Sequence, residues 1–281
     1  MAQASCHLRI RLLHPNDIPF VEHLRTLAGW NQTRSDLQCL MDYEPTGCFL
    51  AEWDGVPVGT ATTTCYGRDI AWIGMILVLP EFRRRGIGTE LMRKCLDYLS
   101  RKQIRCIKLD ASRDGRPVYE RLGFQAEYEI HRWERDGDGS FAAPMTGNKA
   151  LLLDLNIDRR VFGADRYQLL AGFAIRSRIV VRNHDCDTLA GYGMIRSGDR
   201  AAYIGPVVAR DSETGTSIAE ELFKQETARL FWDIPLVCPD AVGLAESSGF
   251  RSVRSLTRMW LGELIVGQPQ LQFGICDLAT G

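Results

Sequence analysis

Residues 73–89 read IGMILVLPEFRRRGIGT, and this stretch predicts a buried strand, a tight basic turn and the start of a helix. The segment from Ile73 to Leu79 is almost wholly apolar, as expected for a strand covered on both faces. Pro80 ends the strand because proline cannot donate to a sheet ladder. Apolar side chains then recur at helical spacing, at Ile87, Leu91, Cys95 and Leu99. The rest of the chain can be placed around this strand, turn and helix.

The turn between strand and helix has the properties of a phosphate site. Arg83, Arg84 and Arg85 supply positive charge, while Gly86 and Gly88 remove side chains where a ligand would approach the backbone. The first N–H groups of a helix lack intrahelical partners and carry partial positive charge, so they bind phosphate or pyrophosphate. The spacing is that of neither a Walker loop nor a dinucleotide-binding loop. A solvated basic turn is the alternative, and for Arg85 taken alone it is sufficient.

Two further motifs accompany the turn. Val78-x-Pro80 precedes Arg83-x-x-Gly86-x-Gly88, and Tyr-Glu-Arg-Leu-Gly-Phe follows at 119–124. In this combination the chain resembles the GNAT superfamily of N-acetyltransferases. The resemblance implies an α+β fold with α/β/α layers, in which a mixed, mostly antiparallel sheet is flanked by helices. It also implies acetyl-CoA as the acyl donor.

The resemblance assigns the donor site residue by residue. The pantetheine arm and thioester would hydrogen-bond to the backbone of Ile76, Leu77 and Val78. The pyrophosphate would lie on the turn made by Arg83, Arg84, Arg85, Gly86, Ile87, Gly88 and Thr89. Tyr119 matches a tyrosine that acts as general acid in many members of the family. A phenol with an ordinary pKa of about 10 is protonated at neutral pH and can donate to a thiolate leaving group. Packing against the cofactor only is the alternative for Tyr119.

The acceptor side carries weaker signals. Asp110 ends a predicted strand where the sheet of this fold splays open, so it is a candidate to receive the ammonium or order a water. An acidic cap for the loop at 112–114 is the equal alternative. Trp30 and Asn31 occupy the joint between the first two helices, which borders the acceptor side, and Trp72 is a third candidate whose default role is core filling. The acceptor would be an amine-bearing small molecule or peptide.

The composition limits the partners and the compartment. Lys plus Arg number 34 and Asp plus Glu 35 among 281 residues, so no global field attracts nucleic acid or an anionic membrane. No stretch reaches the roughly 18 apolar residues of a membrane helix, and the first residues lack the order of a signal peptide. Nine cysteines without a Cys-x-x-Cys pair predict no metal site. We expect a cytoplasmic monomer or homodimer.

The second half of the chain repeats the order of the first. Ile73-Gly74 recurs as Ile204-Gly205, with residue numbers that differ by 131, and Gly123-Phe124 recurs as Gly249-Phe250, with numbers that differ by 126. Two anchors in a matching order of elements indicate a duplicated domain. The predicted units are a catalytic domain at 1–138, a linker at 139–149 and a degenerate copy at 150–281. At these offsets Ser217 replaces Gly86 and Ala245 replaces Tyr119, so one active site per chain is expected.

These observations predict an N-acetyltransferase that moves an acetyl group from acetyl-CoA to a primary amine. A non-catalytic acyl-CoA-binding or sensing module is the competing hypothesis. We further expect the second copy to close one wall of the acceptor site, through residues 203–208 or a loop at 235–240. A chain that ends near Ser140 should then still bind acetyl-CoA if it folds.

Overall fold

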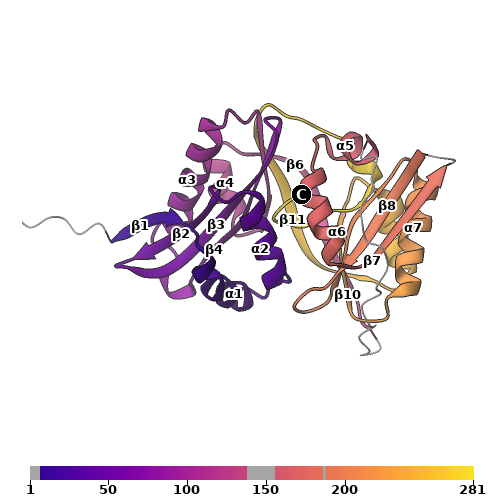
Figure 1. The fold of residues 1–281 in the computed structure, drawn as a ribbon, viewed down its shortest axis with the longest axis horizontal. Coiled ribbons are helices and arrows are strands. Elements are labelled where there is room, and N and C mark those ends of the chain that lie inside the picture. Colours follow the sequence, from indigo (N-terminus) through magenta and orange to yellow (C-terminus); the bar gives the residue numbers. More distant parts are fainter. Residues whose placement is uncertain (1–6, 138–155, 186–187) are drawn as a thin grey trace, which may run out of the picture.

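One continuous sheet runs through the whole molecule (Figure 1). The structure is a computed structural model that describes residues 7–137, 156–185 and 188–281. Its 12 strands follow the order β1-β2-β3-β4-β5-β11-β6-β10-β9-β8-β7, and β12 pairs with β9 outside this path. Helices α1 to α4 lie in the first half, α7 lies at the far side of the second half, and α6 lies between them beside α2 (Figure 1).

The described first half contains six strands and four helices, and among them are the strand and helix predicted around the glycine turn. Asp54 and Gly55, both with positive φ, make the turn of the β2–β3 hairpin. Thr33 and Asp36 form a capping box that starts α2. The strands are β1 (Leu8–Leu12), β2 (Cys48–Trp53), β3 (Val56–Tyr66), β4 (Ile70–Val78), β5 (Cys106–Ala111) and β6 (Gln125–Arg135). The helices are α1 (Ile18–Leu27), α2 (Arg34–Tyr43), α3 (Ile87–Arg101) and α4 (Arg116–Arg121), with 3-10 turns at Pro15–Asp17 and Pro80–Phe82.

Successive side chains of a strand pack against helices on opposite faces of the sheet, which gives the three layers of helix, sheet and helix. On β2, Phe49 and Ala51 pack in the cluster that contains α3, whereas Cys48 and Leu50 pack with α1 and α2. Successive strand residues point to opposite faces, so an apolar strand of this kind is covered on both sides. The predicted α/β/α layering, with a mixed and mostly antiparallel sheet, is confirmed.

The second half repeats this order with a corrected helix. Its strands are β7 (Ser177–Asp185), β8 (Thr188–Arg196), β9 (Ala202–Ala209), β10 (Leu230–Pro235), β11 (Arg251–Gly262) and β12 (Gln272–Gly274). Its helices are α5 (Asn156–Phe162), α6 (Tyr167–Arg176), α7 (Ser212–Gln225) and α8 (Pro239–Ser247), with a 3-10 turn at Pro269–Leu271. The sequence predicts α7 at 217–230 and a strand at Leu236. Both elements are present with different bounds. The Asp211 carboxylate accepts from Thr214 N at 2.8 Å and so starts α7 at Ser212, while β10 begins at Leu230 and ends at Pro235.

Each half completes its sheet with a strand from the other half. Strand β11 lies between β5 and β6, and β6 in turn pairs with β10. Arg258 of β11 stands opposite Asp110 of β5, just as Arg132 of β6 stands opposite Asp233 of β10. A chain that ends near Ser140 would therefore lack a central strand. The predicted linker at 139–149 lies outside the described residues.

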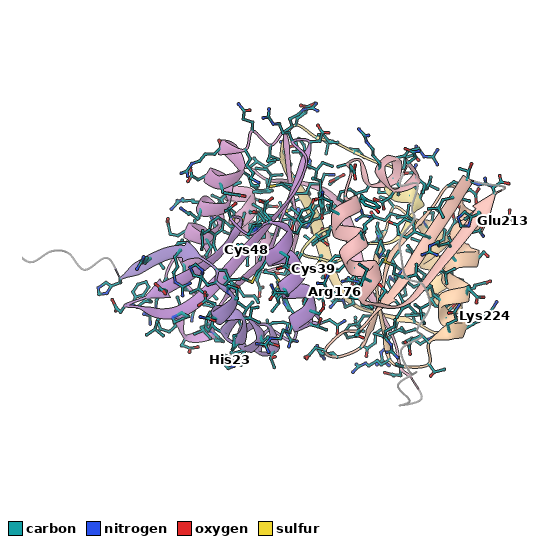
Figure 2. The ribbon with its side chains drawn as sticks, in the orientation of Figure 1. His23, Cys39, Cys48, Arg176, Glu213 and Lys224 are labelled. Atoms are coloured by element: carbon teal, nitrogen blue, oxygen red, sulfur yellow. The ribbon has the colours of Figure 1, made fainter. Side chains whose placement is uncertain are left out.

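The two halves also share an apolar core. Helices α5 and α6 of the second half pack against β3 and β4 of the first, where Phe162 meets Tyr66 edge to face at 5.1 Å. Helix α6 also packs against α2, and Figure 2 shows Cys39 of α2 and Arg176 of α6 close to each other at this boundary. A buried ion pair also connects the halves, because Arg196 of the second half pairs with Asp36 of the first. The halves thus form one folding unit.

Candidate active site

The parallel strands β4 and β5 separate at the centre of the first half. Among the described residues they pair only from Ile70 to Trp72 on β4, opposite 106–108. Beyond this point the backbone from Ile73 to Val78 faces an opening. Met75 has a φ of 50°, and the β3–β4 register shifts between Thr60 and Thr62. This irregularity bends β4 away from β5 and leaves one edge of Ile76, Leu77 and Val78 open.

The glycine turn leaves the start of α3 open. Gly86 is the N-cap with a φ of 82°, a conformation that favours glycine, and no side chain caps the helix. A Cβ atom at Gly86 would meet nothing within 4 Å, and at Gly88 the nearest atom would be Val78 Cγ2 at 3.9 Å. The first N–H groups of Ile87, Gly88 and Thr89 therefore have space for an anion, which fits the pyrophosphate that the sequence predicts here.

Two of the three arginines brace this turn. Arg83 Nε donates to the carbonyl of Val78 at 3.2 Å. The Arg85 guanidinium lies over Trp53 and Phe82, 5.4 and 5.0 Å from the ring centroids. Arg84 sits between them with a φ of 60°. These contacts hold the turn in shape beside the uncapped helix.

A cavity of about 70 Å³ lies at the opening between β4 and β5. This volume holds several water molecules or a small chemical group. Residues of both halves line it: Trp30, Gln32, Ile73, Gly74, Met75, Ile76, Leu109, Asp110, Ser112, Tyr119, Arg132, Arg254, Leu256 and Leu278. The second half therefore forms one wall of this cavity, through β11 and Leu278. Neither residues 203–208 nor 235–240 line the described cavity.

Tyr119 of α4 lines this cavity. The ring packs edge to face on Phe124 at 6.2 Å, which fixes the side chain. Among the described residues, no group hydrogen-bonds to the Tyr119 hydroxyl. Burial raises the pKa of Tyr119 to about 12, because the phenolate would be poorly solvated. The hydroxyl is therefore neutral at physiological pH and able to donate a proton.

Asp110 lines the same cavity but is already engaged. Arg258 donates to both of its carboxylate oxygens, at 2.9 and 3.0 Å, and the Asp110 side chain is fully buried. Burial raises the pKa of the Asp110 carboxyl, and Arg258 opposes that rise. Asp110 is thus a lining residue of the cavity whose carboxylate is also held by the neighbouring strand β11.

The three predicted acceptor residues have different places. Trp30 lines the cavity. Asn31 does not, because its amide accepts from Arg200 N and Ala201 N and donates to Ala201 O, which docks the β8–β9 loop on the first half. Trp72 is buried in the core that the two halves share, with the Arg258 guanidinium 4.4 Å from its ring centroid. Of the three, the structure brings only Trp30 to the cavity.

Sequence reasoning missed the arginines of β6 and β11. Arg132 and Arg254 line the cavity, and Arg132 pairs with Asp233 at 2.8 and 2.6 Å. The repeat in the sequence does hint at the two buried ion pairs, Arg132 with Asp233 and Arg258 with Asp110. Arg132 and Arg258 differ by 126 in residue number, which is the separation of the two Gly-Phe anchors.

The second copy has its corresponding groove filled. Strands β9 and β10 pair from Ala202 to Ile204 and then separate, and β12 pairs with β9 at Val207 and Val208 in that space. The Asp211 carboxylate caps α7, where the first copy has the open glycine turn. Ala245 is buried in α8 at the position that repeats Tyr119. The glycine turn and the open strand edge therefore occur together in the first half, among the residues described.

Two broader features of the described chain complete the site. None of its helices combines the length and apolar character that crossing a membrane requires. Its described His, Cys, Asp and Glu side chains form no group of three or more that could hold a metal ion.

Both halves match models of one acetyltransferase family. Residues 18–124 match the description "Acetyltransferase (GNAT) family", and residues 155–274 match "Acetyltransferase (GNAT) domain". The fold and these matches define a tandem acyltransferase of two related units. The chain belongs to the GNAT family of N-acetyltransferases.

Curated relatives carry the same description. An uncharacterized N-acetyltransferase of Methanocaldococcus jannaschii is 33% identical over 105 residues, which cover 34% of this chain and 46% of the relative. YitH, an uncharacterized N-acetyltransferase of Bacillus subtilis, is 28% identical over 178 residues, which cover 60% of this chain and 62% of the relative. The matched region thus spans about half to three fifths of the length of these relatives.

Solved structures extend the likeness to the whole chain. A proposed acetyltransferase from Pyrococcus horikoshii is 28% identical, with a TM-score of 0.80 and coverage of 100% of this chain and 98% of that one. A tandem GNAT protein from the clavulanic acid biosynthesis pathway is 15% identical, with a TM-score of 0.59 and coverage of 96% and 100%. At this lower identity the second likeness concerns the fold alone.

Proposed function

We propose that the protein transfers an acetyl group from acetyl-CoA to a primary amine in the cavity between β4 and β5. The observation that carries the proposal is the neutral, unpartnered Tyr119 hydroxyl at this cavity. The open edge of Ile76–Val78 and the uncapped glycine turn support binding of the donor along β4 and at the start of α3. We therefore place the catalytic unit in residues 1–138, completed by β11 of the degenerate copy.

The chemistry needs an acid and a place for the amine. Acetyl-CoA would supply a thioester whose carbonyl carbon forms a bond to the amine nitrogen as the bond to sulfur breaks. Tyr119 Oη holds the proton that neutralises the departing sulfur, and its raised pKa keeps that proton in place before transfer. The nitrogen loses one proton as it becomes an amide, and that proton restores the Tyr119 hydroxyl through solvent. Arg258 holds both Asp110 oxygens, yet each oxygen keeps a second lone pair. We propose that Asp110 orients the incoming amine by accepting a hydrogen bond from it.

A thiol-release assay with acetyl-CoA and a panel of primary amines tests this function. Tyr119→Phe should lower kcat by about a hundredfold or more, because general acid catalysis contributes roughly 10²–10⁴-fold. Its affinity for acetyl-CoA, measured by calorimetry, should stay within about twofold of wild type. Tyr98→Phe is the matched control, because the Tyr98 hydroxyl on α3 donates to Glu44 and Tyr98 does not line the cavity.

The outcomes separate enzyme from binding module. Acetyl-CoA binding without turnover of any amine would favour the sensing alternative. Equal losses of turnover and affinity in Tyr119→Phe would assign Tyr119 to donor binding. Absence of acetyl-CoA binding at high micromolar concentration would overturn both functions.

A further inference from the structure

Arg254 is a cation at the cavity that the proposed reaction does not use. It lies on β11 directly opposite Arg132 of β6, just after the register shift between Ser252 and Arg254. Directly opposed residues share one face of a sheet, and like charges in this position are destabilising. Both guanidiniums line the cavity beside Asp110 and Tyr119. The protein therefore maintains two positive charges at one wall of the site.

The described carboxylates near the cavity do not neutralise the positive charges of both Arg132 and Arg254. Arg132 is held by Asp233 through two hydrogen bonds, and Asp233 also accepts from Tyr203 at 3.1 Å. Asp110 is held by Arg258 in the same bidentate manner. In the part of the chain that the structure describes, Arg254 donates no hydrogen bond and forms no ion pair. One positive charge is left at the cavity without a partner.

Arg254 is half-buried, so water solvates its charge only in part. Burial, followed by the nearby charge of Arg132, lowers the pKa of Arg254, and Asp233 offsets only part of this effect. Burying a charge costs free energy unless a counter-charge and hydrogen bonds compensate for it. An anion bound at Arg254 would supply both. The arrangement is thus complementary to an anionic group in the cavity.

Gln32 adds a second unfilled position at the same cavity. Its side chain is 7% exposed, and its amide nitrogen donates to Asp277 Oδ1 at 3.2 Å. Its amide oxygen is buried, and no described group donates to it. An unpaired buried acceptor costs about 1–3 kcal/mol. Gln32, which lines the cavity, therefore carries an unpaired buried acceptor in addition to the spare cation of Arg254.

We propose that Arg254 binds a carboxylate on the acceptor, so that the acceptors are amino acids or similar amino carboxylates. The inference rests on the proposed function, since it names the substrate class of the same site. A carboxylate matches the planar fork of a guanidinium with two parallel hydrogen bonds. A cavity of about 70 Å³ favours a small acceptor group. The amine of such a molecule would be placed toward Asp110 and the Gln32 amide oxygen.

Matched pairs of acceptors test this proposal in the thiol-release assay. Alanine is compared with ethylamine, and phenylalanine with phenethylamine, in wild type and in Arg254→Gln. The members of a pair differ in amine basicity, so the deciding quantity is the change in their kcat/KM ratio between the two proteins. We expect the preference for the amino acid to fall by roughly ten- to hundredfold in Arg254→Gln, with a much smaller change in the rates for the plain amines. Arg254→Lys should keep part of the preference.

Two controls separate this role from a structural one. Arg251→Gln changes an exposed arginine of the same strand that does not line the cavity, and it should leave the ratio unchanged. Calorimetric affinity for acetyl-CoA should be equal in wild type, Arg254→Gln and Arg251→Gln. A common loss of rate with amines and amino acids in Arg254→Gln would overturn the carboxylate role, as would stronger turnover of phosphoethanolamine than of alanine.

Failure of the proposed function can be recognised separately. If no amine releases thiol, calorimetry of alanine and phenylalanine against the full chain still decides the inference. Binding to wild type that is lost in Arg254→Gln would support a carboxylate site. Equal binding to both proteins, or binding to neither, would overturn it.

Discussion

Replacing Arg258 with methionine should remove the counter-charge of Asp110 where β11 of the second half pairs with β5 of the first. We call this sharing of strands between the halves the strand exchange. The guanidinium donates to both Asp110 oxygens and to Tyr128 Oη at 2.8 Å. Only 3% of the Arg258 side chain and none of the Asp110 side chain is exposed. Loss of one partner of a buried ion pair costs about 3–5 kcal/mol. We expect the free energy of unfolding to fall by this amount at neutral pH, a large share of the roughly 5–15 kcal/mol typical of native proteins.

The loss in Arg258→Met should shrink as the pH falls. Burial raises the pKa of the Asp110 carboxyl, and Arg258 opposes that rise. Without Arg258 the pKa in the folded state rises further above the unfolded value of about 3.9. A carboxyl with a raised folded-state pKa stabilises less as the pH rises between the two values, because the unfolded chain then releases the proton first. The variant should therefore be closer to wild type at about pH 5 than at about pH 7.

Urea denaturation followed by tryptophan fluorescence and circular dichroism measures both effects. Arg101→Met is the matched control, since Arg101 pairs with Asp97 at exposed positions on α3, and an exposed helix pair contributes about 0.3–0.5 kcal/mol. A loss in Arg258→Met below about 1 kcal/mol would refute the reasoning. A loss that is the same at both pH values would show that an unpaired Asp110 carboxylate is not its cause.

Three further predictions concern the donor turn, the acid and the exchanged strand. Gly88→Leu should raise the KM for acetyl-CoA at least about tenfold with little change in melting temperature, because the added side chain enters open space at a helical position. A wild-type KM would remove the turn from the donor site. Rates should rise with pH as the amine loses its proton and should not decline up to about pH 10, because burial raises the pKa of Tyr119 to about 12. A descending limb near pH 9 would contradict this assignment. A chain ending at residue 137 should lack cooperative unfolding and acetyl-CoA binding, because β5 and β6 lose β11. Cooperative unfolding by circular dichroism would show that the first half folds alone.

Local signals were sufficient to predict much of the first half. The apolar spacing from Ile87 to Leu99 and the glycine before it predict α3, and Asp54-Gly55 predicts the β2–β3 turn. The glycine turn and Tyr119 follow from short motifs with a clear chemical reason. Each of these signals acts over a few residues, so neighbouring sequence alone specifies it.

The strand exchange could not be predicted from periodicity. Strands β6 and β11 have the same alternation whichever strand pairs with them, and their partners are distant in sequence. The position of Asn31 outside the cavity could not be predicted for the same reason, because its partners Arg200 and Ala201 come from the second half. The place of Arg254 at the cavity likewise depends on its pairing opposite Arg132, which no local pattern specifies. Contacts between the two halves therefore determine which residues lie on the acceptor side of the site, where the sequence motifs give no assignment.

The strand order also determines when the sheet can be completed during synthesis. Asp110 and Arg258 are 148 positions apart. At about 5–20 residues per second, the ribosome releases β11 roughly 7–30 s after β5. During this interval β5 presents an uncovered edge, and such edges pair readily with other chains. The edge of β5 is thus uncovered only while the chain is being made, and it becomes covered once residues 251–262 have emerged and pair with it.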